Sequence, residues 1–586
     1  MKKIVLLVLI MLSVTFAVNR ELHRVKTAII DENSPIPKPP VNIGNLKLEI
    51  GNSSNGNPYP LLPDFGRTEA IGGTCYDWIN GPVFSMLRNS PNNFLFGAWL
   101  WSNTEAMSDR NMYCNIYDWS TKTWAIINPT NYMSSGQSVF PHTLSSVGGG
   151  ADLDPTGKFV VSGQYSLGGV LSVKLARETD AGSGLFEYSQ GPTGYRWPCI
   201  GVTQNQNVHV AAIDVATTYD LYYSRTTSPW TTWTPYVTIA PPGPQPYFPD
   251  QNIAASKISN KVIVVWESSN DPYPERAYYT LSTDGGATWG TSTQIPFPPS
   301  VGMTPGFNIS SLYAMFDGAD NFHIVMSVAD TGYTLPAEIW HYCPTNTPAY
   351  SLIHHYDAET LNAAVGYNAI FATRPSICQN PTNNYLYVAW EQFDSLNYEP
   401  ITNLARADIH IAESRDNGLT WYAKKKITTP NTMSKRFPVV GGVQGDTLLV
   451  MYMNDSIAGA FLQSEHRFCV NPMIVHRVPV PLTAGIEQND YPKFYDFALR
   501  PAIPNPAKSH TAIRYSLSSA GNITLSISDV SGRLVKTLIS ENKPAGEYSI
   551  IWNGKNEFGK KVNAGIYFYT LTTNSKSITR KLVITN

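Results

Sequence analysis

Apolar and polar positions follow one repeated pattern along the middle of the chain, in which two short apolar runs flank a polar turn. Runs of this length, bounded by Gly, Pro, Asn or Asp, are typical of β-hairpins. The repeats begin roughly 50–65 residues apart, a period that indicates propeller blades more than a sandwich. The seven predicted hairpins span Val83–Trp101, Ala151–Gln164, Cys199–Asp214, Ile253–Glu267, Ser310–Asp330, Ser376–Glu391 and Val439–Asp455.

A second pair of apolar runs follows each hairpin. In the fourth repeat it consists of Arg276–Leu281 and Thr291–Ile295, and in the sixth of Asp408–Glu413 and Ala423–Thr428. Four strands make one blade, so the pattern predicts an all-β propeller of seven blades over residues 67–480.

The turn inside this second pair has the form S-x-D-x-G-x-T-W in two repeats. The Asp side chain can accept hydrogen bonds from turn amides, and Gly can take a positive φ. The motif resembles the Asp-box, or BNR repeat, of sialidase-like β-propellers. That resemblance implies a structural turn remote from any active site, and six blades as the alternative count. The motif residues are Ser282, Asp284, Gly286, Thr288 and Trp289, and Ser414, Asp416, Gly418, Thr420 and Trp421.

The ends of the chain differ from the repeats. Lys2 and Lys3 precede an apolar run over residues 4–16 that is shorter than the roughly 18–20 residues of a membrane span. We therefore expect a signal peptide at residues 1–17, with an uncleaved anchor as the weaker alternative, and no later transmembrane segment. Residues 18–66 are rich in Pro, Asn and Gly and are interpreted as a leader.

The last part of the chain is predicted to be a separate domain. Residues 481–502 form a Pro-containing linker, and residues 503–586 contain six apolar runs that predict an Ig-like sandwich. Pro504-Asn505-Pro506, Asp529-Val530-Ser531-Gly532-Arg533 and Ala564-Gly565-Ile566-Tyr567 resemble the Ig-like C-terminal domain of flagellar hook-capping proteins and of type A sorting domains of type IX secretion. The resemblance implies that this domain contacts secretion machinery, and that the protein is secreted from a bacterium or held on its outer surface.

Composition narrows the function. Charged residues are 15% and aromatic residues 12%, and the formal net charge is −2, so a nucleic-acid partner is not expected. The six cysteines are spread singly, without zinc-type spacing. Cys75 and Cys114 are read either as a disulfide or as two buried thiols. Phosphate loops and the hydrolase motifs His-Glu-x-x-His and Gly-x-Ser-x-Gly are absent, and neither cofactor nor metal is predicted. We expect a monomer.

Candidate binding residues map to the face opposite the Asp-boxes. Three blades begin with an Arg close to a Pro, and a fourth carries an aromatic residue there. Guanidinium groups pair bidentately with carboxylates, and sialidases, which these sites resemble, use a three-Arg cluster. The sequence lacks an intact Arg-Ile-Pro, so the alternative is that Pro ends the preceding loop and Arg packs along the rim. The residues are Arg196 and Trp197, Phe248, Arg374, and Arg436 and Phe437.

Acidic residues close the second strand of five blades. Such carboxylates could bind sugar hydroxyls or supply an acid and a base for glycoside hydrolysis. The alternative is that a feature repeated in every blade consists of strand-end caps in solvated turns. The residues are Asp214, Glu267, Asp330, Glu391 and Asp455, with Trp266 before Glu267 and Trp390 before Glu391.

One loop on this face, Phe393–Arg406, is predicted to be the longest and carries Asp394, Tyr398 and Glu399. The sequence thus favours a protein that binds an extracellular glycan or polymer. A sialidase-like glycoside hydrolase, with Arg374, Arg436 and Glu391 as its catalytic candidates, is the alternative. A structural component of a surface layer is a weaker one.

Overall fold

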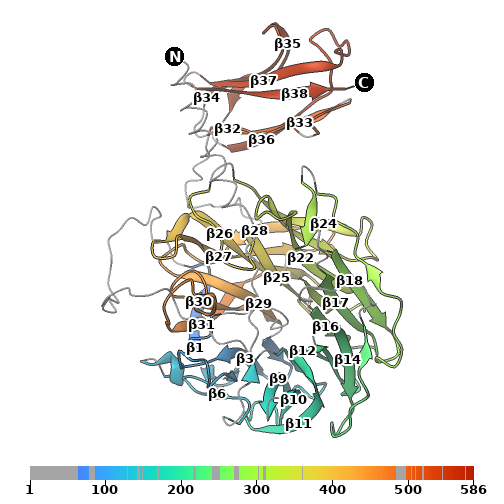
Figure 1. Cartoon of the computed structure of the whole chain (residues 1–586), viewed down its shortest axis with the longest axis vertical. Helices are drawn as coiled ribbons and strands as arrows, with labels where there is room; N and C mark the ends of the chain where they lie inside the picture. Colours follow the sequence, from blue (N-terminus) through green and yellow to red (C-terminus); the bar gives the residue numbers. More distant parts are fainter. Residues whose placement is uncertain are drawn as a thin grey trace. The chain divides into compact units, whose positions relative to one another are not determined.

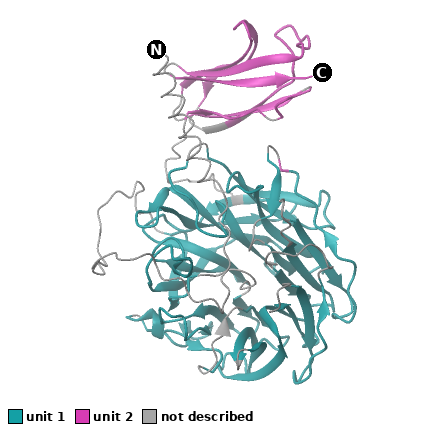
Figure 2. Ribbon diagram, viewed as in Figure 1, with its two compact units in different colours: residues 1–299, 303–485 teal, residues 300–302, 486–586 magenta. Residues whose placement is uncertain are grey.

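This computed structural model describes residues 64–77, 86–128, 130–141, 146–147, 149–167, 170–214, 220–239, 251–268, 276–300, 303–307, 312–358, 361–482, 497–502, 504–508, 510–517, 521–543, 546–573 and 576–585. The chain divides into two compact units (Figure 2), residues 1–299 with 303–485 and residues 300–302 with 486–586. The predicted signal peptide, residues 18–63 of the leader, Phe248 and residues 483–496 of the linker lie outside the described residues.

Over its described residues, the first unit is a β-propeller of seven sheets arranged around a centre (Figure 1). Six of the sheets are formed by strands that follow one another in the chain, and the seventh combines β29, β30 and β31 with β1. The first four blades contain β2 (Leu87–Ser90), β3 (Phe94–Trp101), β4 (Asn111–Asp118), β5 (Thr123–Trp124) and β6 (Gln137–Ser138); β7 (Ser146–Val147), β8 (Ala151–Leu153), β9 (Phe159–Leu167), β10 (Val170–Glu178) and β11 (Phe186–Thr193); β12 (Tyr195–Val202), β13 (Val208–Asp214), β14 (Leu221–Thr226) and β15 (Val237–Thr238); and β16 (Gln251–Ala255), β17 (Val262–Ser268), β18 (Arg276–Ser282) and β19 (Thr293–Gln294).

The remaining blades have the same design, and two short 3-10 helices, η1 (Tyr132–Ser134) and η2 (Phe461–Gln463), lie in connections. Blades five to seven contain β20 (Pro305–Phe307), β21 (Tyr313–Phe316), β22 (Phe322–Asp330), β23 (Ala337–Tyr342) and β24 (Tyr350–Tyr356); β25 (Ala372–Gln379), β26 (Leu386–Glu399), β27 (Leu404–Ser414) and β28 (Tyr422–Lys426); and β29 (Ser434–Gln444), β30 (Thr447–Asp455), β31 (Asn471–Pro479) and β1 (Arg67–Thr74). All seven predicted hairpins are confirmed.

The ring is closed by its first strand. β1 pairs antiparallel with β31, from Arg67 opposite Arg477 to Thr74 opposite Asn471, and so becomes the outer strand of blade seven (Figure 1). Strands from both ends of the propeller sequence therefore share blade seven, so this blade is complete and the ring is closed. Seven blades, and not the alternative six, are therefore present.

Both faces of each inner strand are buried because every blade packs between two others. Between blades six and seven, for example, Tyr387, Ile409 and Ile411 pack with Val440 and Val450, all at most 1% exposed. Removing one such side chain from water stabilises the fold by about 1.5–3 kcal/mol. The near-continuous apolar runs of the hairpins therefore follow from the propeller architecture.

The two S-x-D-x-G-x-T-W turns have the same hydrogen bonds. Ser282 Oγ donates to Asp284 Oδ1 at 2.8 Å, and the same oxygen accepts from the Thr288 amide at 2.9 Å. The second copy repeats the pattern, with Ser414 Oγ donating to Asp416 Oδ1 at 2.9 Å and the Thr420 amide donating at 2.9 Å. Each turn is thus closed by its own side chains.

Each turn also holds its blade against the preceding one. Gly286 has φ 75°, and a Cβ there would lie 1.7 Å from Oη of Tyr223 in blade three. Trp289 packs edge-on against the same Tyr223, with ring centroids 4.6 Å apart. In the second copy, Trp421 Nε1 donates to Ser351 Oγ of blade five at 2.9 Å. The motif therefore links blades on the face away from the candidate site.

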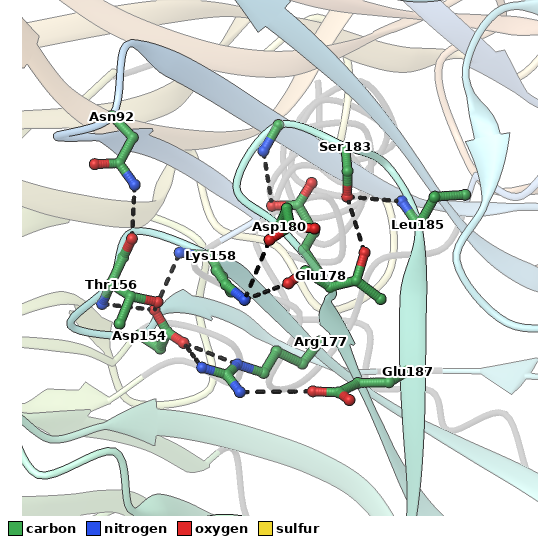
Figure 3. A network of polar contacts seen from close by, with 12 residues as sticks. Asn92, Asp154, Thr156, Lys158, Arg177, Glu178, Asp180, Ser183, Leu185 and Glu187 are labelled. Carbon is green, nitrogen blue, oxygen red and sulfur yellow. Dashed lines mark hydrogen bonds and ion pairs between the residues drawn. The ribbon is translucent and has the colours of Figure 1, made fainter.

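A polar network holds a hairpin turn of blade two (Figure 3). Asp154 Oδ1 accepts from the Thr156 amide at 2.8 Å, and Arg177 Nε donates to Asp154 Oδ2 at 2.8 Å. Arg177 also lies 3.5 Å from Glu187, and Asn92 of blade one donates to the carbonyl of Thr156 at 2.6 Å. Because these groups satisfy one another, we assign this network to blade packing.

The second unit is a sandwich of two sheets around its own apolar core. One sheet has the order β32–β33–β36 and the other β35–β34–β37–β38. Trp552 and Tyr569 are fully buried in the core, and the Tyr569 hydroxyl donates to the carbonyl of Arg500 at 2.8 Å. The strands are β32 (Ala498–Leu499), β33 (Thr511–Leu517), β34 (Gly521–Asp529), β35 (Leu534–Lys543), β36 (Gly546–Trp552), β37 (Gly565–Thr573) and β38 (Ser577–Ile584).

Two further expectations are settled by the fold. All six cysteines are free thiols, so the reading of Cys75 and Cys114 as two buried thiols holds and the disulfide does not. The prediction of a long loop at Phe393–Arg406 is wrong, because β26 continues to Glu399 and β27 begins at Leu404. Pairs such as Asp394 with Arg406 extend the ladder beyond the blade body. In the described part of the chain, no helix is long and apolar enough to cross a membrane.

Candidate functional site

The Arg and Pro positions at three blade entrances form one repeated backbone feature. Trp197, Arg374 and Phe437, each directly before a Pro, have φ of 51°, 52° and 60°. The inner strand is shifted in register at each place, so two residues bulge out of the ladder. Bulges of this kind re-aim side chains. Arg374 therefore occupies the position of Trp197 and Phe437 in the bulge, while Arg196 and Arg436 stand one residue before it.

The bulges of blades six and seven bring the three catalytic candidates together. Glu391, near the middle of β26, is fully buried and pairs through Oε1 with Arg374 Nη1. Its Oε2 accepts from Arg436 Nε at 3.2 Å and from the Phe437 amide at 2.7 Å. Arg374 Nη2 also donates to the carbonyl of Asn368 at 2.7 Å. We call Arg374, Glu391 and Arg436 the Glu391 cluster.

Electrostatics keep this carboxylate ionised. Burial acts to raise the pKa of Glu391, but Arg436, Arg374 and the Phe437 amide together hold that pKa below its usual value. Both carboxylate oxygens are engaged by donors. Glu391 is therefore suited to holding two guanidinium groups in place, and poorly suited to taking or giving a proton.

A pocket opens beside the Glu391 cluster, on the face opposite the S-x-D-x-G-x-T-W turns. It is a small hollow that is partly open to solvent. We call it the Arg436 pocket. Blade entrances, the connection after β30 and the segment after β1 all contribute to it. The lining residues are Asp77, Gly366, Tyr367, Arg374, Arg436, Phe437, Gly459, Ala460 and Glu465.

Arg436 presents the free end of its guanidinium to this pocket. Its Nε donates to Glu391 Oε2, and within the described residues neither Nη1 nor Nη2 donates to a protein acceptor. Phe437, which is half-buried, lies against both guanidinium groups, with its ring centre 4.9 Å from Cζ of Arg374 and 4.7 Å from Cζ of Arg436. This packing fixes the plane of the guanidinium.

A second buried polar group lies beneath one wall of the pocket. His466 Nε2 is 3.1 Å from Asp77 Oδ2, which also accepts from the Phe461 amide at 2.6 Å. Asp455, Cys469 and His466 bring one ligand atom each to within 4.8 Å of one another. Burial acts to lower the pKa of His466, but Asp77 and Cys469 raise it to about 11. Burial raises the pKa of Asp455 to about 7.

The other predicted binding residues do not join this pocket. Trp266 and Trp390 are 2% and 0% exposed in the core between blades, so the prediction that they lie on an open face is wrong. Glu267, Glu391 and Asp455 are also buried, at 2%, 0% and 0%, and not solvated caps, whereas Asp214 and Asp330 are half-buried.

The predicted binding residues of blade three and of the β26–β27 extension make contacts outside the Arg436 pocket. Arg196 is 5% exposed and stacks on Trp197, with Cζ 4.5 Å from the ring centre. Glu399 is buried and accepts from Arg406 Nη2 at 2.8 Å. Asp394 accepts from the Leu396 amide at 2.9 Å, and Tyr398 is 40% exposed. These residues line no part of the Arg436 pocket.

The sequence prediction missed six of the nine lining residues, Asp77, Gly366, Tyr367, Gly459, Ala460 and Glu465. The predicted site residues came from the blade entrances, the ends of the second strands and the loop Phe393–Arg406. The equivalent segment of blade seven, residues 456–470, is richer in apolar residues but carries Gly459, Glu465 and His466. Asp77 lies on the pocket only because β1 closes blade seven, a contact that spans nearly the whole propeller sequence.

Comparisons with known proteins identify the C-terminal unit. Residues 506–577 match the family model of the FlgD Ig-like domain. No protein in the curated set matches the sequence of this chain.

Solved structures similar to the chain include a polysaccharide lyase, a sialidase and a β-propeller domain. An ulvan lyase of polysaccharide lyase family 25, bound to -[GlcA(1-4)Rha3S]-, aligns at 10% identity with TM-score 0.41, covering 70% of this chain and 96% of its own. A Hadza microbial sialidase aligns at 11% identity, TM-score 0.31, covering 63% and 73%. The β-propeller domain of the Trilobed protease from Pyrococcus furiosus aligns at 8% identity, TM-score 0.33, covering 64% and 92%. At these TM-scores the likeness carries no inference about substrate.

Proposed function

We propose that the propeller binds an acidic glycan outside the cell through the Arg436 pocket. The observation that carries the proposal concerns the guanidinium of Arg436. Its Nε is held by Glu391, while Nη1 and Nη2 make no hydrogen bond within the described residues. Two parallel N–H donors match the two oxygens of a carboxylate or the edge of a sulfate. An anionic sugar is the ligand class that fits this donor pair in an extracellular setting.

The remaining lining suits the neutral part of a sugar. Phe437 and Tyr367 are half-buried and offer apolar surface for the C–H faces of a ring, while Glu465 supplies carboxylate oxygens that accept from hydroxyls. A small number of polar groups in a mostly apolar wall is enough to orient a small ligand. Because Glu391 is engaged on both oxygens, the proposal is a binding role and not catalysis by that residue.

A glycan array probed with the full chain tests this proposal. We expect binding to glycans that carry uronic acid, sialic acid or sulfate groups, and none to their neutral counterparts. Since the interaction depends on charge, it should weaken as salt is raised from about 50 mM to about 500 mM. An array without any bound glycan, or with neutral glycans only, would refute it.

A sialidase-like hydrolase is the second candidate function. Its specific support is that Arg374 and Arg436 meet around one pocket with the carboxylates of Asp77 and Glu465. A hydrolase needs one of these to act as an acid or nucleophile. The two functions separate on the same arrayed ligands, because a hydrolase releases reducing sugar over time and a binding protein leaves the glycan intact.

We further propose that residues 503–586 act as a sorting domain of type IX secretion, and that the propeller is of the Asp-box type. Support for the first comes from a domain with its own core and from a basic surface, with eleven Lys and Arg against four Asp and Glu in these residues. Support for the second comes from the two S-x-D-x-G-x-T-W turns. The basic surface suits contact with an acidic partner.

Deletion of residues 503–586 is expected to stop export of the protein in its bacterial host. The propeller has a separate core, so the truncated chain should still fold and should accumulate in the periplasm. Cell fractionation and immunoblotting against a periplasmic marker measure the distribution. Release of the truncated protein at the level of the full chain would overturn the sorting role.

A further inference from the structure

Three side chains of types that can bind a metal lie close together near the two ends of the connection between β30 and β31, residues 456–470. Asp455 is the last residue of β30, and Cys469 stands two residues before β31 begins at Asn471. His466 lies between them in sequence. One ligand atom from each of Asp455, His466 and Cys469 lies within 4.8 Å of the other two. The fold therefore brings a carboxylate oxygen, an imidazole nitrogen and a thiol sulfur to one point.

Buried polar atoms without partners point to a missing ligand at that point. Asp455 Oδ2 and Asp77 Oδ1 are fully buried side-chain oxygens that form no hydrogen bond within the described residues, although both residues are at most 1% exposed. A buried carboxylate oxygen that accepts no hydrogen bond destabilises the fold, because it has lost its contacts with water without replacement. Two such oxygens beside one imidazole and one thiol are better explained by a bound cation than by packing.

The imidazole is oriented as a metal ligand. His466 Nδ1 lies 2.7 Å from the carbonyl oxygen of Arg467. A carbonyl can only accept, so Nδ1 carries the hydrogen and Nε2 is the ring atom available to a cation. Metal-bound histidines commonly donate their second N–H to a backbone carbonyl in this way. Nε2 is also the atom that faces Asp77 Oδ2 at 3.1 Å.

We propose that Asp455, His466 and Cys469 bind one Zn²⁺ ion, with Asp77 beside the fourth position. Mixed O, N and S donors fit zinc, which accepts all three in tetrahedral sites. Zinc bonds of about 2.0–2.3 Å separate ligand atoms by roughly 3.3–3.6 Å, so small side-chain rotations bring the three atoms into place. Zinc binds the thiolate and the neutral imidazole, so binding releases the Cys469 thiol proton and the proton on Nε2 of His466, and it places a positive charge beside the buried carboxylates.

The site has a consequence for the Arg436 pocket. Residues 456–470 supply Gly459, Ala460 and Glu465 to the pocket wall, and the ion would fix both ends of this connection to the strands. Zinc is thus a structural element of blade seven, and its binding can be measured without any glycan.

Cobalt and zinc titrations of the full chain, stripped with a chelator, test the site. We expect one equivalent of Co²⁺ to bind, with visible absorption of tetrahedral Co²⁺ and a near-ultraviolet band from the sulfur ligand, and Zn²⁺ to displace it. Cys469→Ser should remove the sulfur band and weaken binding at least 100-fold, and His466→Gln should also weaken it strongly. Asp77→Asn is expected to weaken binding about 10–100-fold.

Cys378→Ser is the matched control, because Cys378 is also a partly exposed free cysteine of the propeller and lies outside the cluster. It should bind Co²⁺ like the wild type and keep the sulfur band. Melting temperatures of all variants in chelator establish that they are folded. Failure of the wild type to bind a stoichiometric ion, or equal binding by Cys469→Ser and Cys378→Ser, would overturn the proposal.

Discussion

Glu391→Gln is expected to destabilise the propeller by about 3–5 kcal/mol, because it leaves two buried guanidinium groups without the carboxylate between them. Glu391 is fully buried, and Arg374 and Arg436 are each 4% exposed. The amide of Gln has the same shape but one oxygen and no charge, so the arginines lose their ion pairs and repel each other. Calorimetry of the full chain should record a melting temperature lowered by about 5–10 °C.

The pH dependence of this loss has a definite sign. The folded-state pKa of Glu391 lies below its usual value, so the ionised group contributes stability that is present above the unfolded pKa of about 4.3. That contribution is lost as pH falls through the folded pKa. The stability gap between wild type and Glu391→Gln should therefore be constant from about pH 8 to about pH 5 and should shrink in more acidic buffer.

Glu105→Gln is the control, since Glu105 is an exposed carboxylate of blade one. Its melting temperature should match the wild type within about 1 °C. A Glu391→Gln protein as stable as this control at neutral pH would show that the Glu391 cluster does not hold blades six and seven together.

The blade order could be predicted because each hairpin combines two apolar runs with a polar turn, features that are local in the sequence. Ser376–Glu391, for example, contains both strands and the turn of the first hairpin of blade six. Local pattern also placed Arg374, Arg436 and Glu391 on one face, since strand starts and strand ends alternate between the two faces of a blade.

Contacts between blades could not be predicted from the local sequence pattern. Trp266 and Trp390 looked available for binding because they precede acidic residues, yet both faces of a propeller sheet are covered by neighbouring blades and both rings are buried. The bulge before each Pro could not be predicted from the sequence either. Because of this bulge, Arg374 occupies in blade six the position that Phe437 occupies in blade seven. The pocket depends on such long-range placement.

Arg436→Lys is expected to weaken glycan binding at least 10-fold while changing stability by only about 1 kcal/mol. The ammonium of Lys keeps a positive charge beside Glu391, so the buried carboxylate stays paired. It cannot hold Glu391 and also present two parallel donors to an anionic sugar, because it lacks the planar fork of Arg. Binding and folding are thereby separated in one variant.

Arg196→Lys is the matched control, because Arg196 occupies the same position before a bulge in blade three and is buried against Trp197 without lining the pocket. It carries the same chemical change and should leave glycan affinity unchanged. Loss of binding in both variants would mean that the substitution acts on the blades in general.

The most direct measurement is therefore isothermal titration of the best acidic glycan from the array into wild type, Arg436→Lys and Arg196→Lys, in the same low-salt buffer. If the glycan binds in the Arg436 pocket, the wild type and Arg196→Lys will show saturable one-to-one binding, and Arg436→Lys will have a Kd at least 10-fold higher. Equal affinity of Arg436→Lys and wild type would contradict it.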